Sequence, residues 1–253
     1  MLEVKGLGVQ AGGQKLIGDI SFSLLAGDWL MLVGPNGAGK STMLNAISQA
    51  LPYTGNVTFD EKDLARMKPR RRAACLGVLG QRHAVGYAFT VLEVVRLGRY
   101  AAQGSFFSRQ GDPQGRQLID QAIAMTGLEH LLDHSVLTLS GGELQRVFLA
   151  QLFAQDPRLL LLDEPANHLD LLYQQQLFGL LQTWLKTPGR ALISVVHDLS
   201  LARKYGTRAL LLHQGKMAAS GEVKAALTSQ TLQSVYQMDV FAWMRGLLSQ
   251  WQA

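Results

Sequence analysis

The residues with the clearest chemistry form one short glycine-rich segment that starts at Gly34. It reads Gly-Pro-Asn-Gly-Ala-Gly-Lys-Ser-Thr, which fits the pattern G-x-x-x-x-G-K-S. Glycines let successive backbone N–H groups point at one anion. Lys40 can reach β- and γ-phosphates, and the Ser41 hydroxyl can bind Mg²⁺. The pattern predicts a phosphate-binding loop (P-loop) made of Gly34, Pro35, Asn36, Gly37, Ala38, Gly39, Lys40, Ser41 and Thr42.

A P-loop binds phosphate only when a strand leads into it and a helix begins at its end. The apolar run Trp29–Val33 predicts a strand before it, and the sequence 41–51 predicts a helix after it. A helix beginning at the loop adds unpaired amides and the positive end of its dipole. A glycine-rich turn that matched the pattern by chance would not need both flanks, so the context favours the phosphate site.

A second group of chemical residues follows the apolar run Leu159–Leu162, which ends in Asp163 and Glu164. An unbroken apolar run is typical of a buried parallel strand, and such sheets bind ligands at the carboxyl ends of their strands. We expect Asp163 in the Mg²⁺ shell, usually through water, and Glu164 to polarise a water molecule in line with the γ-phosphate. Without the P-loop, a solvated polar strand end would be the better interpretation.

The bulk composition supports a folded chain with a sizeable core. Of 253 residues, 47% are hydrophobic and 17% are charged, which argues against disorder. The net charge of +5 fits an ordinary surface, or affinity for nucleotides, anionic membranes or nucleic acid, and does not choose among them. The basic run from Lys68 to Arg72 has two interpretations, a solvated helix face or contact with lipid headgroups.

The single cysteine, Cys75, excludes an internal disulfide, and its apolar neighbours predict that it is buried.

The N-terminal residues lack the pattern of a signal peptide, and no apolar run approaches the ~20 residues of a membrane-spanning helix. We therefore expect a soluble chain that meets a membrane only through a partner.

Strand-type and helix-type segments alternate along the chain. This order predicts an α/β fold with a largely parallel sheet. A helical middle third and a mostly helical end from Glu222, with Trp243 and Trp251 as apolar anchors, are also expected. The expected strands are 2–9, 16–25, 29–33, 55–60, 76–80, 158–163, 191–196 and 210–213, and the expected helices are 41–51, 90–102, 117–126 and 141–155, with a loop at 103–114.

Further motifs, in a fixed order, make the chain resemble the ABC transporter ATPases. Leu139–Glu143 reads LSGGE and resembles the signature motif LSGGQ. Gln81 follows a predicted strand, like the family's Q-loop glutamine, and His197 matches its switch histidine. The sequence 165–170, Pro-Ala-Asn-His-Leu-Asp, resembles the D-loop and keeps Asp170. These motifs and the P-loop cover residues 34 to 198.

The resemblance implies a fold and roles for these residues. The fold would be a single nucleotide-binding domain over 1–253, with an antiparallel β subdomain and a helical subdomain at about 84–157. ATP and Mg²⁺ would be the cofactors, with Ser41, Gln81 and Asp163 around the metal. Gln81 would sense Mg²⁺ and the γ-phosphate, and His197 would hold the attacking water with Glu164. The catalytic set is then Lys40, Gln81, Glu164 and His197.

The resemblance also implies a second copy of the chain as partner. The signature residues Ser140, Gly141, Gly142 and Glu143 would cap the γ-phosphate bound by the other copy, so that two chains enclose two ATP molecules. Asp170 would carry communication between the copies. Glu143 departs from the family glutamine, and its effect stays open.

One further departure concerns the base of the nucleotide. Family members usually stack adenine on an aromatic residue twenty-odd residues before the P-loop, and here Ala11 lies near that place. We expect weaker or less base-selective binding, because stacking is worth on the order of 1–3 kcal/mol.

Two segments, 88–99 and 198–202, resemble the importer branch for vitamin B12, iron-siderophores and haem. In that branch the first segment receives a helix of a separate permease. The resemblance implies a peripheral subunit on the cytoplasmic face of the inner membrane, served indirectly by a substrate-binding protein, without nucleic acid. Importers of zinc, manganese or molybdate and a soluble ABC ATPase remain alternatives. The intact Lys40, Asp163, Glu164 and His197 oppose a regulator that binds nucleotide without hydrolysis. The cargo cannot be identified from this chain.

Overall fold

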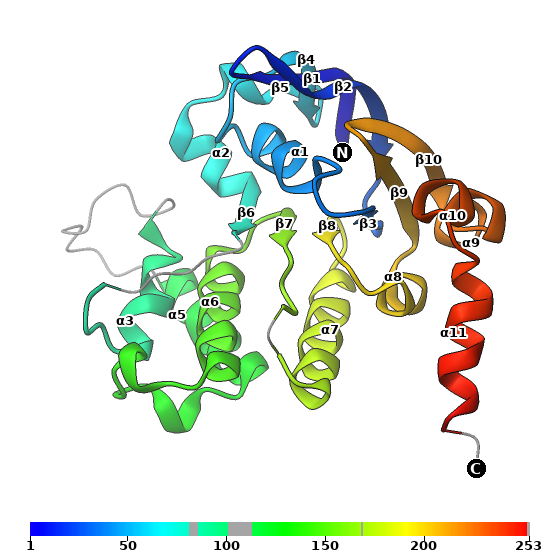
Figure 1. Cartoon of the computed structure of the whole chain (residues 1–253). Coiled ribbons are helices and arrows are strands. Elements are labelled where there is room, and N and C mark those ends of the chain that lie inside the picture. The colour runs from blue at the N-terminus through cyan, green and yellow to red at the C-terminus, as the bar shows by residue number, and fades with distance from the viewer. Residues whose placement is uncertain (81–85, 101–112, 168, 252–253) are drawn as a thin grey trace. The chain divides into compact units, whose positions relative to one another are not determined.

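A computed structural model describes residues 1–80, 86–100, 113–167 and 169–251. The chain, whose helices and strands are labelled in Figure 1, divides into two compact units. The first contains Met1–Leu24, Asp28–Glu61 and Val195–Ala253, and the second contains Leu25–Gly27 and Lys62–Ser194. No helix in the described part of the chain combines the length and hydropathy needed to cross a bilayer.

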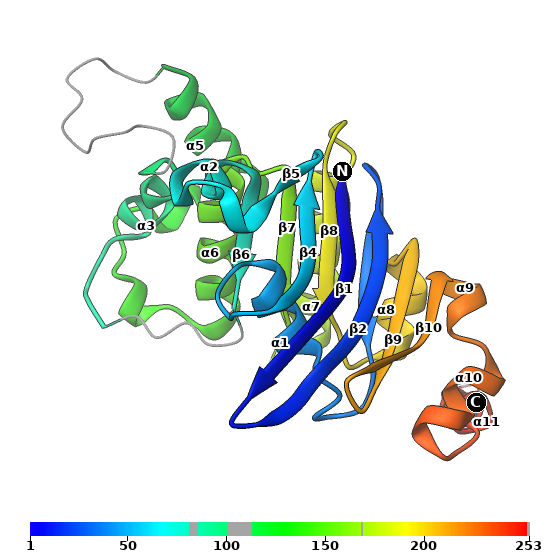
Figure 2. The same cartoon turned by 90° about the horizontal axis from the view of Figure 1, so that it is seen from above.

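The first unit contains two groups of strands. In one, β1 pairs antiparallel with β2 and β4, and Figure 2 shows β1 and β2 side by side. In the other, β9 pairs parallel with β3 and antiparallel with β10. The strands are β1 (Leu2–Ala11), β2 (Gln14–Leu24), β3 (Trp29–Val33), β4 (Thr54–Phe59), β9 (Arg208–His213) and β10 (Lys216–Glu222).

Helices pack on these strands. Helix α1 contacts β1 and β2, α8 contacts β3, and α9 and α10 contact β10. The fully apolar strand β3 is buried along its whole length, which fixes the start of the loop that follows it. The helices are α1 (Lys40–Ile47), α8 (Leu199–Tyr205), α9 (Val223–Ala226), α10 (Ser229–Tyr236) and α11 (Val240–Ser249).

The second unit combines parallel strands with a group of helices. Strand β6 pairs parallel with β7, while α3, α5 and α6 contact one another. Phe153 of α6 stacks on the buried Trp184 of α7, with ring centroids 6.3 Å apart. The elements are β5 (Lys62–Asp63), α2 (Pro69–Cys75), β6 (Leu76–Leu79), α3 (Val91–Leu97), α5 (Pro113–Thr126), α6 (Gly141–Gln155), β7 (Leu159–Asp163), α7 (Leu171–Leu185) and most of β8 (Ala191–Val195), with one-turn 3₁₀ helices at Leu64–Arg66, Glu129–Leu131 and Val136–Thr138.

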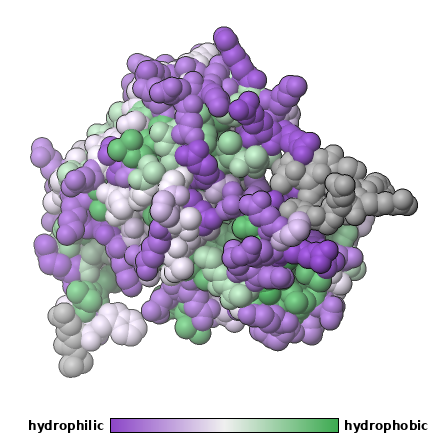
Figure 3. Space-filling model, turned by 180° about the vertical axis from the view of Figure 1, so that it is seen from behind, coloured by the Kyte–Doolittle hydropathy of each residue, from purple (hydrophilic) through white to green (hydrophobic). Residues whose placement is uncertain are grey.

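The parallel and antiparallel pairs confirm the α/β prediction. The helical subdomain boundaries at 84–157 remain a prediction, and the compact unit that contains these helices is wider. Helix α2 buries none of its residues, as a solvated basic face would. Figure 3 shows hydrophilic side chains over most of one face of the molecule, with apolar ones in scattered patches.

Several expectations about local structure are wrong. The helix expected at 41–51 ends at Ile47, because Gln49 adopts a left-handed φ of 69° and the chain turns there. The helix expected at 90–102 ends at Leu97, and residues 101–102 lie outside the described residues. In the loop expected at 103–114, Pro113 already begins α5, and 103–112 are not among the described residues.

Two predictions about burial are also wrong. Cys75 is only half-buried, because it is the last residue of the exposed helix α2. Trp243 and Trp251 are exposed, by 56% and 86%, and do not anchor the C-terminal segment. Helix α11 fully buries only Val240, so most of its apolar residues face away from the unit.

Candidate functional site: a phosphate loop and a signature helix

The P-loop connects β3 to α1 and depends on glycines for two different steric reasons. Gly34 has a φ of 147°, and a Cβ there would lie 2.2 Å from the carbonyl oxygen of Leu212. Gly39 has a φ of 99°, and a Cβ there would lie 2.5 Å from Cδ1 of Ile17. Strands β9 and β2 therefore leave no room for a side chain at either end of the loop. At Gly37, in contrast, no atom of the surrounding residues lies within 4 Å of the Cβ position.

Lys40 folds back along this loop. Its Nζ donates hydrogen bonds to the carbonyl oxygens of Gly34, at 2.8 Å, and Pro35, at 3.0 Å, and the residue is only 6% exposed. Two backbone carbonyls thus hold the ammonium group over the curled backbone. At the start of α1 the N–H of Met43 donates to the carbonyl oxygen of Gly39 at 2.9 Å, so the amides of the residues before Met43 point toward the loop. Among the described residues, no side chain caps this helix start.

Tyr236, the last residue of α10, contacts the same loop from the C-terminal part of the chain. Its phenolic oxygen accepts a hydrogen bond from the backbone N–H of Gly34. Burial raises the pKa of Tyr236, and this bond opposes the shift in part. Sequence reasoning missed this residue, because nothing in its local pattern indicates a contact with a loop some two hundred positions earlier.

His197 lies in the same unit as the P-loop. The residue before it, Val196, donates from its N–H to the carbonyl of Leu32 in β3 at 3.2 Å, so the segment is tied to the strand that leads into the loop. Asp198 then caps α8 by accepting from the N–H groups of Ser200 (2.7 Å) and Leu201 (3.3 Å). His197 is exposed between these two fixed points.

The carboxylate pair lies in the second unit, at the end of β7. Asp163 is 5% exposed. Glu164 follows with a φ of 51°, a left-handed conformation that is uncommon for a residue with a side chain and tends to occur at functional sites. Its Oε2 accepts a hydrogen bond from Nδ2 of Asn167 at 3.0 Å.

The signature residues begin α6 with a reciprocal capping box. Ser140 Oγ accepts from the N–H of Glu143 at 3.3 Å, while Oε2 of Glu143 accepts from the Oγ of Ser140 at 2.7 Å and from its N–H at 2.8 Å. The side-chain and backbone hydrogen bonds from Ser140 lower the pKa of Glu143. The unusual glutamate at this position thus closes the cap, as a glutamine could, with a negative charge beside Gly141 and Gly142.

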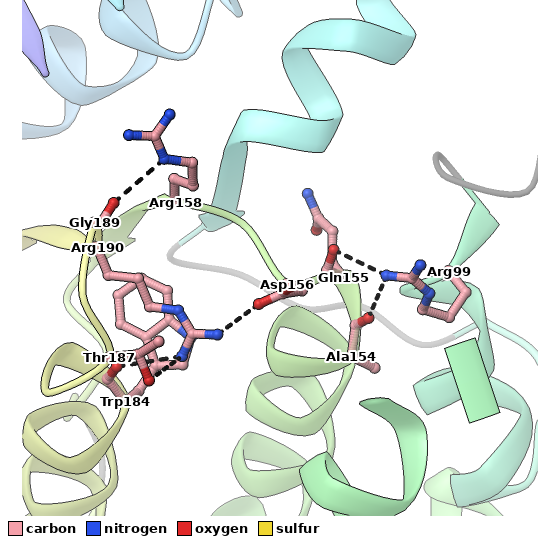
Figure 4. A network of polar contacts seen from close by, with 9 residues as sticks. All are labelled: Arg99, Ala154, Gln155, Asp156, Arg158, Trp184, Thr187, Gly189 and Arg190. Atoms are coloured by element: carbon pink, nitrogen blue, oxygen red, sulfur yellow. Dashed lines mark hydrogen bonds and ion pairs between the residues drawn. The ribbon is translucent and has the colours of Figure 1, made fainter. Parts of the chain in front are cut away.

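The far end of α6 is held by a polar network (Figure 4). Nη1 of Arg99, which is 7% exposed, donates to the last-turn carbonyls of Ala154 (3.0 Å) and Gln155 (3.3 Å). A Cβ on Gly98 would lie 2.1 Å from the carbonyl oxygen of Gln151, so the end of α3 packs directly on this turn. On the other side Asp156 pairs with Arg190, whose guanidinium lies 4.7 Å from the ring centre of Trp184. Helix α6 is thereby fixed to α3 and α7 at its C-terminal end.

Asp170 is the N-cap of α7, accepting from the N–H of Tyr173 at 2.9 Å.

The predicted site residues divide between the units. Residues 34–42 and His197 belong to the first, and Asp163, Glu164, Ser140–Glu143 and Asp170 to the second. Gln81 and His168 of the predicted motifs lie outside the described residues.

The comparisons with known proteins agree with this arrangement. The sequence model of the family described as "ABC transporter" matches residues 17–167, the greater part of the chain. The hemin import ATP-binding protein HmuV of Pseudomonas entomophila is 38% identical over 95% of this chain and 94% of its own length. HmuV of Gloeobacter violaceus is 38% identical over 92% and 86%.

An ABC transporter ATP-binding protein of Bacillus subtilis, YvrA, is 38% identical over 95% of this chain, which spans only 54% of that longer protein. Among solved structures, a transporter described as being of the metal-chelate ABC type matches with a TM-score of 0.79 and 25% identity, over 94% of this chain and 89% of its own. A dimeric ATP-binding cassette bound to ADP and phosphate matches with a TM-score of 0.75 and 25% identity, over 88% and 99%. The chain belongs to the ABC transporter family, as an ATP-binding and ATP-hydrolysing subunit.

Proposed function

We propose that this chain powers an importer for haem or a related metal chelate, such as vitamin B12 or an iron-siderophore. The observation that carries the proposal is the 38% identity to two hemin import ATP-binding proteins over 92–95% of the chain. The structural likeness to a metal-chelate type transporter supports the same substrate class.

The chemistry proposed for the chain is in-line attack of water on the γ-phosphate of ATP. Lys40 would exchange its two loop carbonyls for β- and γ-phosphate oxygens, while the amides at the start of α1 hold the remaining charge. Glu164, oriented by Asn167, would accept the proton of the attacking water. His197 would position this water and the γ-phosphate, and Gln81 would sense both the metal and the γ-phosphate.

The residues present fit a magnesium ion brought by the nucleotide. Mg²⁺ usually uses one or two protein oxygens together with phosphates and waters. Ser41 at the start of α1 and the buried Asp163 at the end of β7 would supply such oxygens, and Gln81 would be a third ligand. The described residues contain no cluster of three or more His, Cys, Asp or Glu side chains that could hold a metal without phosphate. When bound, the ion neutralises charge that develops on the phosphates.

A second copy of the chain would complete each ATP site. A turn of Ser140, Gly141 and Gly142 at the start of a fifteen-residue helix is suited to a partner's γ-phosphate, because helix N-termini bind anions. The likeness to dimeric ATP-binding cassettes supports this homodimer.

A separate permease would bind near α3, and the chain would then be peripheral to the cytoplasmic face of the membrane. Aromatic and apolar side chains are exposed around this helix, and the packing of Gly98 and Arg99 on α6 offers a mechanical path from it to the signature. The exposed residues are Tyr87, Phe89, Leu97 and Tyr100. A substrate-binding protein outside the membrane would deliver the cargo.

The test is uptake in cells whose only copy of the chain carries Glu164→Gln. The variant should bind ATP without turnover, and growth on haem or on a ferric siderophore as sole iron source should fail. Growth under zinc, manganese or molybdate limitation should stay normal. If the variant instead grows poorly only when zinc, manganese or molybdate is limiting, the cargo is that metal or oxyanion and the proposed metal chelate is wrong. Normal growth in all media and purification without a membrane protein would instead indicate a soluble ABC ATPase.

A further inference from the structure

The ring of Tyr173, near the start of α7, lies directly against the signature turn. A Cβ placed on Gly142 would lie 3.1–3.2 Å from three atoms of this ring. This separation is tighter than ordinary van der Waals contact, so the ring lies where the side chain of any other residue at position 142 would begin. The ring is half-buried, and Cζ of Arg146 lies 6.0 Å from its centre on the α6 side.

Tyr173 is also fixed to the D-loop through its backbone. Its N–H is the donor that Asp170 caps at 2.9 Å, and Nε2 of Gln174 donates to the carbonyl of Leu169 at 2.9 Å. The backbone from which the ring projects is therefore tied to the residues just before α7.

A hydrogen bond also joins α6 to the segment before α7. Nε2 of Gln145, the fifth residue of α6, donates to the carbonyl of Pro165 at 2.9 Å. Between these ties lies a small cavity with room for about one water molecule, lined by residues of both helix starts, including Gly142, Gln145, Leu169 and Tyr173. The start of α6 thus meets the residues around the start of α7 at two places, Pro165 and Tyr173.

We infer that Tyr173 is a positioning residue, because its ring packs against the signature turn and holds it in place. A displacement of the D-loop at Asp170 would then also displace the amides of Gly141 and Gly142. The inference rests on the proposed two-copy ATP site, in which these amides bind the partner's γ-phosphate. An amide nest that is misplaced by about 1 Å loses much of its effect on the transition state. The contact also explains why a β-carbon at position 142 would be costly even before a nucleotide arrives.

The test uses Tyr173→Ala and Tyr173→Phe in the full chain. Alanine removes the ring and keeps the backbone N–H that Asp170 caps, while phenylalanine keeps the ring. We expect alanine to lower kcat for ATP by about tenfold or more and phenylalanine to stay close to the native chain. Tyr53→Ala, which removes another half-buried tyrosine in the first unit, controls for general loss of stability.

Two further measurements separate positioning from simple destabilisation. Affinity of the single chain for nucleotide depends on its own P-loop, so Tyr173→Ala should leave the Kd for ADP unchanged. In the hydrolysis-deficient Glu164→Gln background, however, Tyr173→Ala should raise the ATP concentration needed for dimer formation by about tenfold.

Each outcome has one meaning. If Glu164→Gln forms a dimer and the added Tyr173→Ala does not change its ATP dependence, the positioning role is wrong while the two-copy site stands. A similar loss in Tyr173→Phe, or an equal loss of ADP binding, also contradicts the role of the ring. If Glu164→Gln forms no dimer at all, the proposed two-copy site itself fails.

Discussion

Asn167 donates a hydrogen bond from Nδ2 to Oε2 of Glu164 at 3.0 Å, so a D-loop residue orients the carboxylate that we assign as general base. Glu164 also has a left-handed backbone, with a φ of 51°. The hydrogen bond to Asn167 is a specific target for mutation.

The first prediction concerns this bond. Replacing Asn167 with Ala should lower kcat for ATP by about tenfold, equivalent to about 1.4 kcal/mol in the barrier, because the carboxylate is no longer oriented. KM should change little, since Asn167 does not belong to the P-loop. Steady-state kinetics check both values. Asn167→Gln, which keeps the amide on a longer side chain, is the matched control, and an unchanged kcat in the alanine variant would show that Glu164 needs no such support.

A second prediction concerns the capping box of α6. Ser140→Ala removes one cap acceptor and should cost about 1 kcal/mol of the free energy of unfolding at neutral pH. Ser140→Thr keeps the oxygen and should cost less. Denaturant titrations of the nucleotide-free chain measure these differences.

The pH dependence of this effect has a definite sign. The hydrogen bonds from Ser140 lower the pKa of Glu143 in the folded chain relative to the ordinary value of 4.5. The stabilisation from the carboxylate is therefore complete above that ordinary value and is lost as the pH falls through the lowered one. The difference between the native chain and Ser140→Ala should shrink below about pH 4.5. A difference that grows on acidification would contradict this assignment.

The third prediction concerns the base of the nucleotide. Ala11 is exposed at the end of β1, followed by the glycine turn 12–13. Ala11→Tyr supplies a ring where the family has one and should tighten ATP binding by about 1–3 kcal/mol, roughly 5- to 150-fold. Ala11→Leu controls for added apolar surface. Calorimetric titration with ATP and GTP measures the effect, and strong preference for ATP in the native chain would contradict the expected loss of base selectivity.

The sequence predicted the elements whose signals are local. The strand at Trp29–Val33 and the helix at Gly141–Gln155 have the expected bounds, because an apolar run before a glycine loop and a serine cap followed by Glu143 define them without distant contacts. The whole of α7 received no assignment, although Asp170 caps it. Leucines lie on the exposed as well as the buried side of this helix, as Leu171 and Leu172 show, so its apolar residues do not follow a clear helical period.

Contacts between distant residues could not be predicted in this way. Two examples are the hydrogen bond between Tyr236 and Gly34 and the packing of the Tyr173 ring beside Gly142. Both depend on how separate elements pack. The expectation that Trp243 is an anchor failed for the same reason. A tryptophan on an amphipathic helix indicates burial only if another element covers that face, and the structure shows Trp243 to be 56% exposed.

The most direct test is the oligomeric state of Glu164→Gln in the presence of nucleotide. Sedimentation velocity of this variant with saturating Mg-ATP should show a dimer, which disappears without nucleotide or when Lys40→Ala is added. A Glu164→Gln chain that binds ATP and yet stays a monomer, both alone and in its membrane assembly, would contradict the shared ATP site.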